Sequence, residues 1–243
     1  ALYKEGAQVT GVDLSRRLVQ AARQRSPKEI RYLVGDARRL DMLDSESFDA
    51  ITCVLAAQNM NPVEPVFQEC ARLLKPGGRL VLVVTHPAFR IPRQSHWGWD
   101  EDRKLLYRAV DRYLSPLKVP IDVRPFKAPG RAITWTYHRP LQDYVNALAQ
   151  AGLWVNALEE WPSHKVSQPG PMAEAENRAR SEFPLFLALR AVKVSESSLP
   201  AEAENKHTQG AAPGPQAQGP DRRPASRPRR PPSRGEGKTK PPR

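Results

Sequence analysis

Four short apolar stretches in the first 85 residues have the pattern of β-strands. Residues 7–13 and 30–36 each end in an aspartate, whereas residues 48–56 and 79–84 are almost continuously apolar. Uninterrupted apolar runs of this length are typical of strands that are buried on both faces of a parallel sheet. The sequence therefore predicts four strands here, the last two of them fully buried.

Helical patterns separate these strands. Ser15 is a suitable N-cap for a helix whose apolar positions repeat every four residues. These positions are Leu14, Leu18 and Ala22. A second helix has Phe67, Cys70 and Leu74 on one face, and Pro-Gly-Gly at residues 76–78 provides a strong stop signal. Strands that alternate with helices in this way favour a doubly wound, Rossmann-like α/β fold with a mostly parallel sheet.

The same alternation resumes after residue 139. Residues 139–152 have a helical pattern that Gly152 closes, and residues 153–161 and 183–194 have the pattern of two further strands. The helix has an apolar face made of Leu141, Tyr144, Val145 and Leu148. We expect a long polar loop, residues 162–182, to join the last two strands.

Residues 86–139 interrupt this alternation and differ from it chemically. They hold 8 of the 17 aromatic residues and 11 basic side chains against 5 acidic ones. Residues 119–126 and 132–138 flank Pro129 and Gly130, which predicts a β-hairpin. We interpret this segment as a cap inserted over the carboxyl ends of the strands.

Charge and proline are spread unevenly along the 243 residues, which carry a formal net charge of +12. Residues 196–243 hold 10 of the 25 prolines, 10 basic and 5 acidic side chains, and no aromatic residue. Such a segment buries too little apolar surface to offset the entropy of ordering it. We expect residues 1–195 to fold and residues 196–243 to be a disordered tail, whose basic run would contact polyanions without sequence preference.

Cys53 and Cys70 are the only cysteines, and both lie in apolar patterns. This usage is typical of buried, reduced thiols in a cytoplasmic protein. No Cys-x-x-Cys pair or His/Cys cluster has metal-ligand spacing, so the sequence predicts no metal site. No stretch has the roughly 20 apolar residues that a membrane span needs, and we expect no membrane contact.

The aspartates that end the first two strands are the leading candidates for ligand binding. In an open parallel sheet, ligands bind outside the carboxyl ends of the strands, where Asp13 and Asp36 are expected to lie. A carboxylate at Asp13 can accept both hydroxyls of a ribose. Asp36, with the backbone N–H of Ala37, can contact an adenine amine and ring nitrogen. One such aspartate is also a common helix cap, but two at successive strand ends form a more specific signal.

Four segments occur in a characteristic order: VTGVDLS (9–15), LVGDARRL (33–40), FDAITCVLAAQNM (48–60) and ECARLLKPGGRLVLVV (69–84). This series resembles the class I S-adenosylmethionine-dependent methyltransferases, in particular the group acting on small molecules that includes quinone-biosynthesis enzymes. The resemblance is close over about residues 1–85 and holds in outline over 140–195. It implies a seven-stranded sheet with an antiparallel last strand and S-adenosylmethionine as cofactor, and it does not identify what is methylated. The aromatic cap and the lack of a recognisable RNA-binding module favour a small molecule as methyl acceptor, which is the first hypothesis.

The resemblance also implies roles for individual residues. Asp13 would bind the ribose, Leu14 would line the adenine, and Asp36 and Ala37 would contact the adenine amine. Backbone at the end of the third strand would face the methionine part of the cofactor. This backbone segment includes Leu55, Ala56 and Gln58.

The family's first strand and its glycine-rich loop have no counterpart in the chain, which begins at Ala1. In the family, that loop lies under the methionine and ribose of the cofactor, and the strand is central in the sheet. We therefore expect a fragment of a longer protein, truncated at its amino end and weakly active or inactive alone, because backbone groups beside the gap would be unpaired. Micromolar or tighter S-adenosylmethionine binding by residues 1–243 would contradict this expectation.

The cap supplies the candidates for acceptor binding and catalysis. His86 lies two residues beyond a strand end, where a histidine can take a proton from an oxygen or nitrogen acceptor. The alternative is that His86 caps the strand or binds backbone. Trp97 and Trp99 are candidates for a pocket wall, with core packing as an equal alternative, and Asn59 is either a substrate contact or a turn residue. Further substrate-binding candidates are Arg90 and Tyr137.

The basic character of the cap and tail leaves alternatives open. It indicates an anionic acceptor or a nucleic acid, or else a solvated face. Four basic residues fall at helical spacing, namely Arg103, Lys104, Arg108 and Arg112. An RNA or protein methyltransferase is therefore the second hypothesis, although no Asn-Pro-Pro-Tyr or Asp-Pro-Pro-Tyr motif follows the third strand. A non-catalytic binding protein on the same fold is the third.

Overall fold

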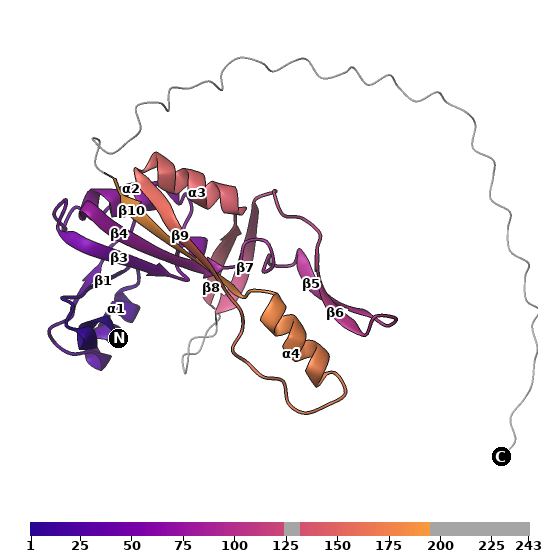
Figure 1. Cartoon of the computed structure of the whole chain (residues 1–243). Coiled ribbons are helices and arrows are strands. Elements are labelled where there is room, and N and C mark those ends of the chain that lie inside the picture. Colours follow the sequence, from indigo (N-terminus) through magenta and orange to yellow (C-terminus); the bar gives the residue numbers. More distant parts are fainter. Residues whose placement is uncertain (124–131, 195–243) are drawn as a thin grey trace, which may run out of the picture. The chain divides into compact units, whose positions relative to one another are not determined.

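Helices separate most of the strands up to residue 85 and again from residue 141, and the elements described between these two parts are all strands (Figure 1). The computed structural model describes residues 1–123 and 132–194, so the predicted tail of residues 196–243 lies outside the described part. The strands are β1 (Thr10–Asp13), β2 (Arg31–Val34), β3 (Phe48–Val54), β4 (Leu74–Thr85), β5 (Ser95–Asp100), β6 (Leu105–Val110), β7 (Leu117–Val123), β8 (Ala132–His138), β9 (Leu153–Trp161) and β10 (Phe186–Lys193). The helices are α1 (Arg16–Arg25), α2 (Glu64–Leu73), α3 (Leu141–Gln150) and α4 (Ala173–Glu182), with short 3-10 turns η1 (Leu2–Glu5) and η2 (Ala57–Asn59).

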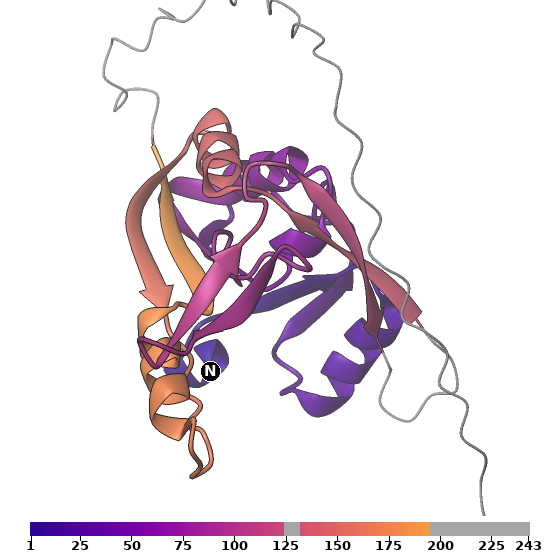
Figure 2. The same cartoon turned by 90° about the vertical axis from the view of Figure 1, so that its right-hand side faces the viewer.

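The main sheet has the strand order β3-β4-β10-β9. Strands β3 and β4 are parallel, whereas β10 runs antiparallel to both β4 and β9. Helices α2 and α3 contact each other, and they pack against β4 and β9 respectively (Figures 1 and 2). The architecture is a Rossmann-like α/β fold, and the predicted antiparallel last strand is confirmed.

A second, two-stranded sheet holds β1 and β2, which are parallel and contact α1. In the described part of the chain, no strand ladder joins β1 or β2 to β3. The strands expected in one sheet are therefore divided between two. As a result β3 is an edge strand with no buried residue, and Val54 is 58% exposed. The prediction that β3 is buried on both faces is wrong: none of its residues is buried, and no strand of the described residues pairs with its outer edge.

The main hydrophobic core lies between the larger sheet and its two helices. The predicted apolar face of α2 and the following residue is confirmed, since Phe67, Cys70 and Leu74 are all buried. The prediction of a fully buried strand holds for Leu80, Leu82, Val83 and Val84 of β4, whereas Val81 is only partly buried. Helix α3 buries Tyr144 and Leu148 as predicted. Fully burying a Leu or Phe side chain contributes about 1.5–3 kcal/mol, so this cluster supplies most of the apolar stabilisation.

Helix α1 begins where the sequence predicts. The Ser15 hydroxyl accepts a hydrogen bond from the backbone N–H of Leu18 at 3.3 Å, which confirms Ser15 as N-cap. The predicted apolar face is wrong, because Leu14 is 70% and Leu18 58% exposed, whereas Val19 is the residue that α1 buries. The amino-terminal sheet therefore gains little buried surface from its helix.

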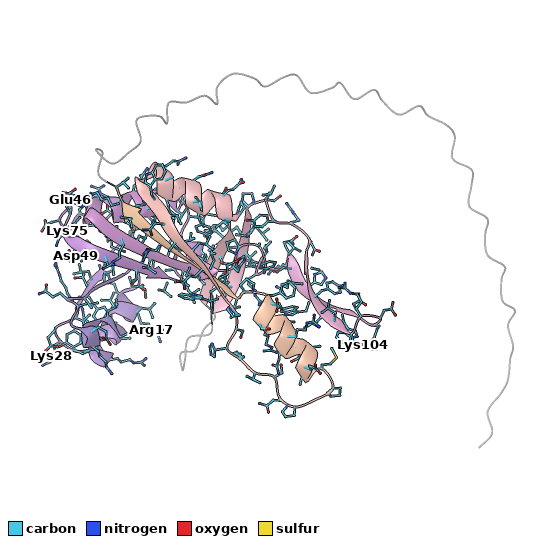
Figure 3. The ribbon with its side chains drawn as sticks, in the orientation of Figure 1. Arg17, Lys28, Glu46, Asp49, Lys75 and Lys104 are labelled. Atoms are coloured by element: carbon cyan, nitrogen blue, oxygen red, sulfur yellow. The ribbon has the colours of Figure 1, made fainter. Side chains whose placement is uncertain are left out.

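The Pro-Gly-Gly sequence acts within β4 rather than at the end of α2. The helix ends at Leu73, and the pairing of β3 with β4 shifts register before Arg79. Gly77 has φ +76°, and a Cβ on Gly78 would lie 2.8 Å from the carbonyl oxygen of Lys75. Both positions therefore require glycine. Lys75 also pairs with Asp49 at 2.8 Å, at the same end of the sheet as Glu46 (Figure 3).

Two hairpins form the cap. Antiparallel pairing of β7 with β8 confirms the predicted hairpin, whose turn lies outside the described residues. The helical spacing of basic residues is misleading, because residues 105–110 form strand β6, which pairs with β5, and Lys104 lies at the turn between them (Figure 3). The loop predicted at 162–182 contains α4, which the sequence pattern missed because the helix buries only Ala179.

Arg72 fastens the loop after β2 to α2. Its Nη2 donates to the carbonyls of Leu40 and Leu43 at 3.2 and 3.0 Å, and its Nη1 donates to the hydroxyl of Ser45 at 2.9 Å. Glu69 completes the cluster, because its Oε1 accepts hydrogen bonds from Arg72 Nη2 and from the backbone N–H of Leu40, both at 2.7 Å.

In the described residues, no helix is long and apolar enough to cross a membrane.

Candidate functional site

The carboxyl ends of β1 and β2 place two aspartates beside each other. Asp13 pairs in register with Val34, and the backbone N–H of Gly35 donates to the carbonyl of Asp13 at 3.1 Å, so Asp36 follows directly at the same edge. Asp13 Oδ1 accepts a hydrogen bond from the backbone N–H of Ser15 at 2.7 Å. Asp13 Oδ2 accepts none from the described residues, and the side chain is exposed. Asp13 is therefore free to accept a ligand hydroxyl.

Asp36 is held by its own loop. Its carboxylate accepts hydrogen bonds from the backbone N–H and the guanidinium of Arg38, which hold the pKa of Asp36 below its usual value. The carboxylate therefore stays ionised at neutral pH. The adjoining Ala37 packs against the main hydrophobic core, which brings the end of β2 to the larger sheet.

The turn after β3 is tied to the end of β4. The N–H of Leu55 donates to the carbonyl of Val83 at 2.7 Å, and Leu55 has φ +54°, in the left-handed region. Gln58 lies two residues after Ala56, and its Oε1 accepts a hydrogen bond from the N–H of Thr85 at 3.0 Å. Backbone at Leu55 therefore turns sharply at the carboxyl edge of the sheet.

Asn59 lies in the same turn. Its side-chain amide is exposed and donates to the carbonyl of Leu55 at 3.5 Å. This contact stabilises the turn and leaves the substrate-binding role of Asn59 a prediction.

His86 directly follows the last residue of β4 and is buried. Its Nδ1 accepts hydrogen bonds from the N–H groups of Ala88 and Phe89 at 3.2 and 3.3 Å. Nδ1 therefore carries no proton, so Nε2 carries it and donates to Oε1 of Glu160 at 2.7 Å. Both nitrogens are occupied in this arrangement, which is that of a strand cap. Proton transfer at His86 would require Nδ1 to lose its backbone partners.

Trp97 lies between two arginines on the cap. Its ring is 5.4 Å from the guanidinium carbon of Arg90 and 5.1 Å from that of Arg108, and it packs edge-on against Phe183. Burial lowers the pKa of both arginines, and the charge of Arg90 lowers that of Arg108 further. Both remain charged at neutral pH.

Trp99 has a different neighbour. It lies two residues further along β5, beside the carboxylate of Glu101, whose pKa is lowered first by Lys104 and then by Trp99.

A small cavity of about 20 Å³ lies where the turn after β3, the end of β4, β8 and α3 meet. It brings together four predicted site residues, namely Gln58, His86, Arg90 and Tyr137. Three other residues that line the cavity were not predicted as site residues, namely Thr85, Arg139 and Tyr144. No local sequence pattern indicates a role for Arg139, because its partner Met60 lies 79 positions away in the sequence. Trp97, Trp99, Asn59 and the two aspartates do not line this cavity.

The two cysteines are free thiols. Burial raises the pKa of Cys70 to about 12 and also raises that of Cys53, so both stay protonated and unreactive at neutral pH. Within residues 1–123 and 132–194, no three His, Cys, Asp or Glu side chains gather as metal ligands would.

The amino-terminal third of the chain matches a family model described as a methyltransferase domain, over residues 1–82. It is 40% identical over 85 residues to ubiquinone biosynthesis O-methyltransferase of Xanthomonas oryzae, covering 34% of this chain and 36% of that protein. The protein of the same name from Coxiella burnetii is 34% identical over 93 residues, covering 37% and 39%. The matches span little more than a third of the length of these curated relatives.

A solved structure is similar over most of the chain. An S-adenosylmethionine-dependent methyltransferase from Mesorhizobium loti is 28% identical, with a TM-score of 0.58, and the similarity covers 78% of this chain and 83% of that one. The likeness therefore extends well beyond the range of the family model.

Proposed function

Because the chain belongs to the class I S-adenosylmethionine-dependent methyltransferases, we propose that it binds S-adenosylmethionine and transfers the methyl group to a small-molecule acceptor. The observation that supports this most is the pair of aspartates at the carboxyl ends of adjacent parallel strands, with Leu55 at the end of β3. Ligands of open parallel sheets bind at this edge.

The side chains at this edge suit an adenosine. Asp13 Oδ2 is unoccupied in the described part and would accept a ribose hydroxyl, while Oδ1 keeps the start of α1 in place. Leu14 is 70% exposed, and an adenine lying on it would remove that apolar surface from water. Asp36, held as a carboxylate by Arg38, and the N–H of Ala37 would then address the amine and ring nitrogen of the base.

The cofactor, when bound, supplies a methyl group on a positively charged sulfur. The chain's task is to hold an acceptor atom in line with that methyl and to manage its proton. His86 is our candidate for the proton acceptor, provided that its Nδ1 exchanges its contacts with Ala88 and Phe89 for the acceptor's proton. Glu160 would stabilise the resulting imidazolium through the existing bond to Nε2.

A small molecule is the acceptor that the cap supports best. Described residues of the cap, among them Tyr137 and Arg90, line a small hollow of about 20 Å³ at the end of β4, where a group of a small acceptor can be held. Two relatives carry the name ubiquinone biosynthesis O-methyltransferase, which favours an oxygen acceptor. We place the reaction in the cytoplasm, since both cysteines are free thiols.

Cofactor binding is tested directly by saturation-transfer NMR of S-adenosylmethionine with the full chain, a method that detects weak binding. Asp13→Asn removes a charged acceptor and is expected to weaken binding by about tenfold to a hundredfold. Asp41→Asn is the matched control, because Asp41 is 69% exposed and pairs only with Arg39. Equal affinities for wild type and Asp13→Asn would refute the assignment of Asp13.

Methyl transfer needs a separate experiment. The full chain is incubated with radiolabelled S-adenosylmethionine and a metabolite extract, and labelled products are separated by size. Label in small molecules supports the proposal, label in RNA or protein would replace the acceptor class, and binding without transfer would indicate a non-catalytic binding protein.

A further inference from the structure

Arg139 has a buried donor that nothing in the described residues accepts. The side chain is 7% exposed and lies between β8 and α3. Its Nη2 donates to the carbonyl of Met60 at 2.6 Å and to Oδ1 of Asn61 at 2.8 Å. Its Nη1 is shielded from solvent and has no hydrogen-bond partner there. Buried cationic donors are almost always satisfied, so the position of Nη1 calls for an acceptor that the described residues do not supply.

The surroundings of Arg139 are positively charged. Arg90 lines the same cavity, and none of the residues lining it is acidic. Arg90 uses its Nε and Nη2 on the carbonyls of Pro184 and Phe183, which are neutral partners. Two guanidinium groups at one cavity without a carboxylate in its wall favour an anion inside it, because charges interact strongly where water is excluded.

Tyr144 offers a second donor at the same place. The residue is 3% exposed and also lines the cavity. Burial raises the pKa of its hydroxyl, although the nearby charge of Arg139 opposes that rise. The hydroxyl therefore keeps its proton at neutral pH and has it available for an acceptor.

We infer that Arg139 and Tyr144 bind a carboxylate group of the methyl acceptor, one oxygen facing Nη1 and the other the tyrosine hydroxyl. The cavity of about 20 Å³ is of the size that holds one water, so one carboxylate oxygen fills it and the rest of the acceptor stays outside. The inference rests on the proposed function, since it assigns the ligand to the methyl acceptor.

The test uses benzoate as probe and benzamide as its neutral counterpart, titrated into the isotope-labelled full chain without cofactor and followed by NMR. Wild type is expected to bind benzoate at least about tenfold more tightly than benzamide, as one hydrogen bond to a charged group would give. Arg139→Met should abolish that preference. Arg112→Met, which changes an exposed arginine of the cap, should preserve it.

Arg139→Met also removes two contacts to the turn after η2, so its fold is checked by circular dichroism. If it does not fold, Tyr144→Phe serves instead, because it keeps the hydrogen bonds of Arg139 to Met60 and Asn61 and should lower benzoate affinity severalfold. Equal affinity for the two probes, no binding of either, or a preference unchanged in the folded variants would overturn the inference and leave a buried water as the partner of Nη1. If benzoate binds in an Arg139-dependent way but no methyl transfer occurs, the carboxylate site stands and the proposed methyl transfer is overturned. If carboxylated and neutral acceptors are methylated equally, only this inference is overturned.

Discussion

The two sheets of this molecule contribute to the proposed site in opposite ways. The sheet of β1 and β2 has four-residue strands and carries Asp13 at the end of β1 and Asp36 just past the end of β2, and α1 buries only Val19. The sheet of β3, β4, β10 and β9 holds the main core and places the cavity at the end of β4. The residues proposed to recognise the cofactor thus lie on the less buried region, and those proposed to hold the acceptor on the more buried one.

This difference indicates how the two halves of the site are kept in place. Acceptor residues such as His86 and Arg139 are fixed by packing and by hydrogen bonds between distant segments. Asp13 and Asp36 are fixed mainly by bonds within their own loops. Regions with few buried contacts open with lower free energy than the core. A bound cofactor would therefore order the β1–β2 sheet more than it orders the rest.

The largest expected contrast comes from the same substitution in each region. Leu82→Ala in β4, where Leu82 is 1% exposed, should lower the free energy of unfolding by about 2–5 kcal/mol. Leu18→Ala in α1, where Leu18 is 58% exposed, should change it by less than about 0.5 kcal/mol. Equilibrium denaturation in guanidinium, followed by circular dichroism, measures both. Similar losses for the two variants would mean that α1 is packed as firmly as β4.

Hydrogen exchange should sharpen the comparison strand by strand. Amides of β1 and β2 are expected to exchange at least about tenfold faster than those of β4 and β10, because their opening exposes less apolar surface. Mass spectrometry of proteolytic fragments provides the measurement. S-adenosylmethionine should slow exchange in β1 and β2 and leave β10 unchanged. Uniform protection of both sheets would erase the distinction.

The two strand-end caps should also differ in strength. His86→Ala leaves the N–H groups of Ala88 and Phe89 without their partner at a buried site, which should cost about 1–3 kcal/mol of stability. Asp13→Ala frees one exposed N–H and should cost less than about 1 kcal/mol. His86→Asn, whose Oδ1 can replace Nδ1, is the control and should recover part of the loss. A larger effect at Asp13 would reverse the order.

The smallest effect concerns the charge of Asp36. Arg38 holds the pKa of Asp36 below the ordinary value of 3.8, so Arg38→Gln should raise it toward that value. A depressed pKa in the folded state stabilises it at pH values above the ordinary pKa, and this contribution is lost as pH falls through the depressed value. NMR titration of the carboxyl carbon measures the shift. Arg39→Gln should leave the pKa of Asp36 unchanged, because Arg39 pairs with Asp41 instead.

Several features that depend on neighbouring residues could be predicted from the sequence. The Ser15 cap, the β7–β8 pairing and the apolar face of α2 all follow from local patterns. The exposure of β3 does not, because an apolar run shows that a strand suits burial and not whether another strand lies beside it. Arg139 was missed for the same physical reason, since its partners lie in a turn far away in sequence.

The Arg72 cluster has a mechanical consequence. In the described residues no strand ladder joins β2 to β3, so a force pulling on the amino end reaches the larger sheet through the loop of residues 36–47 and through the small hydrophobic cluster around Leu40, Leu43 and Leu73. Arg72 holds that loop at Leu40, Leu43 and Ser45, and its own helix α2 is anchored in the core. Arg72 therefore transfers part of a pull on the first two strands to α2, which lowers the load on the exposed edge strand β3.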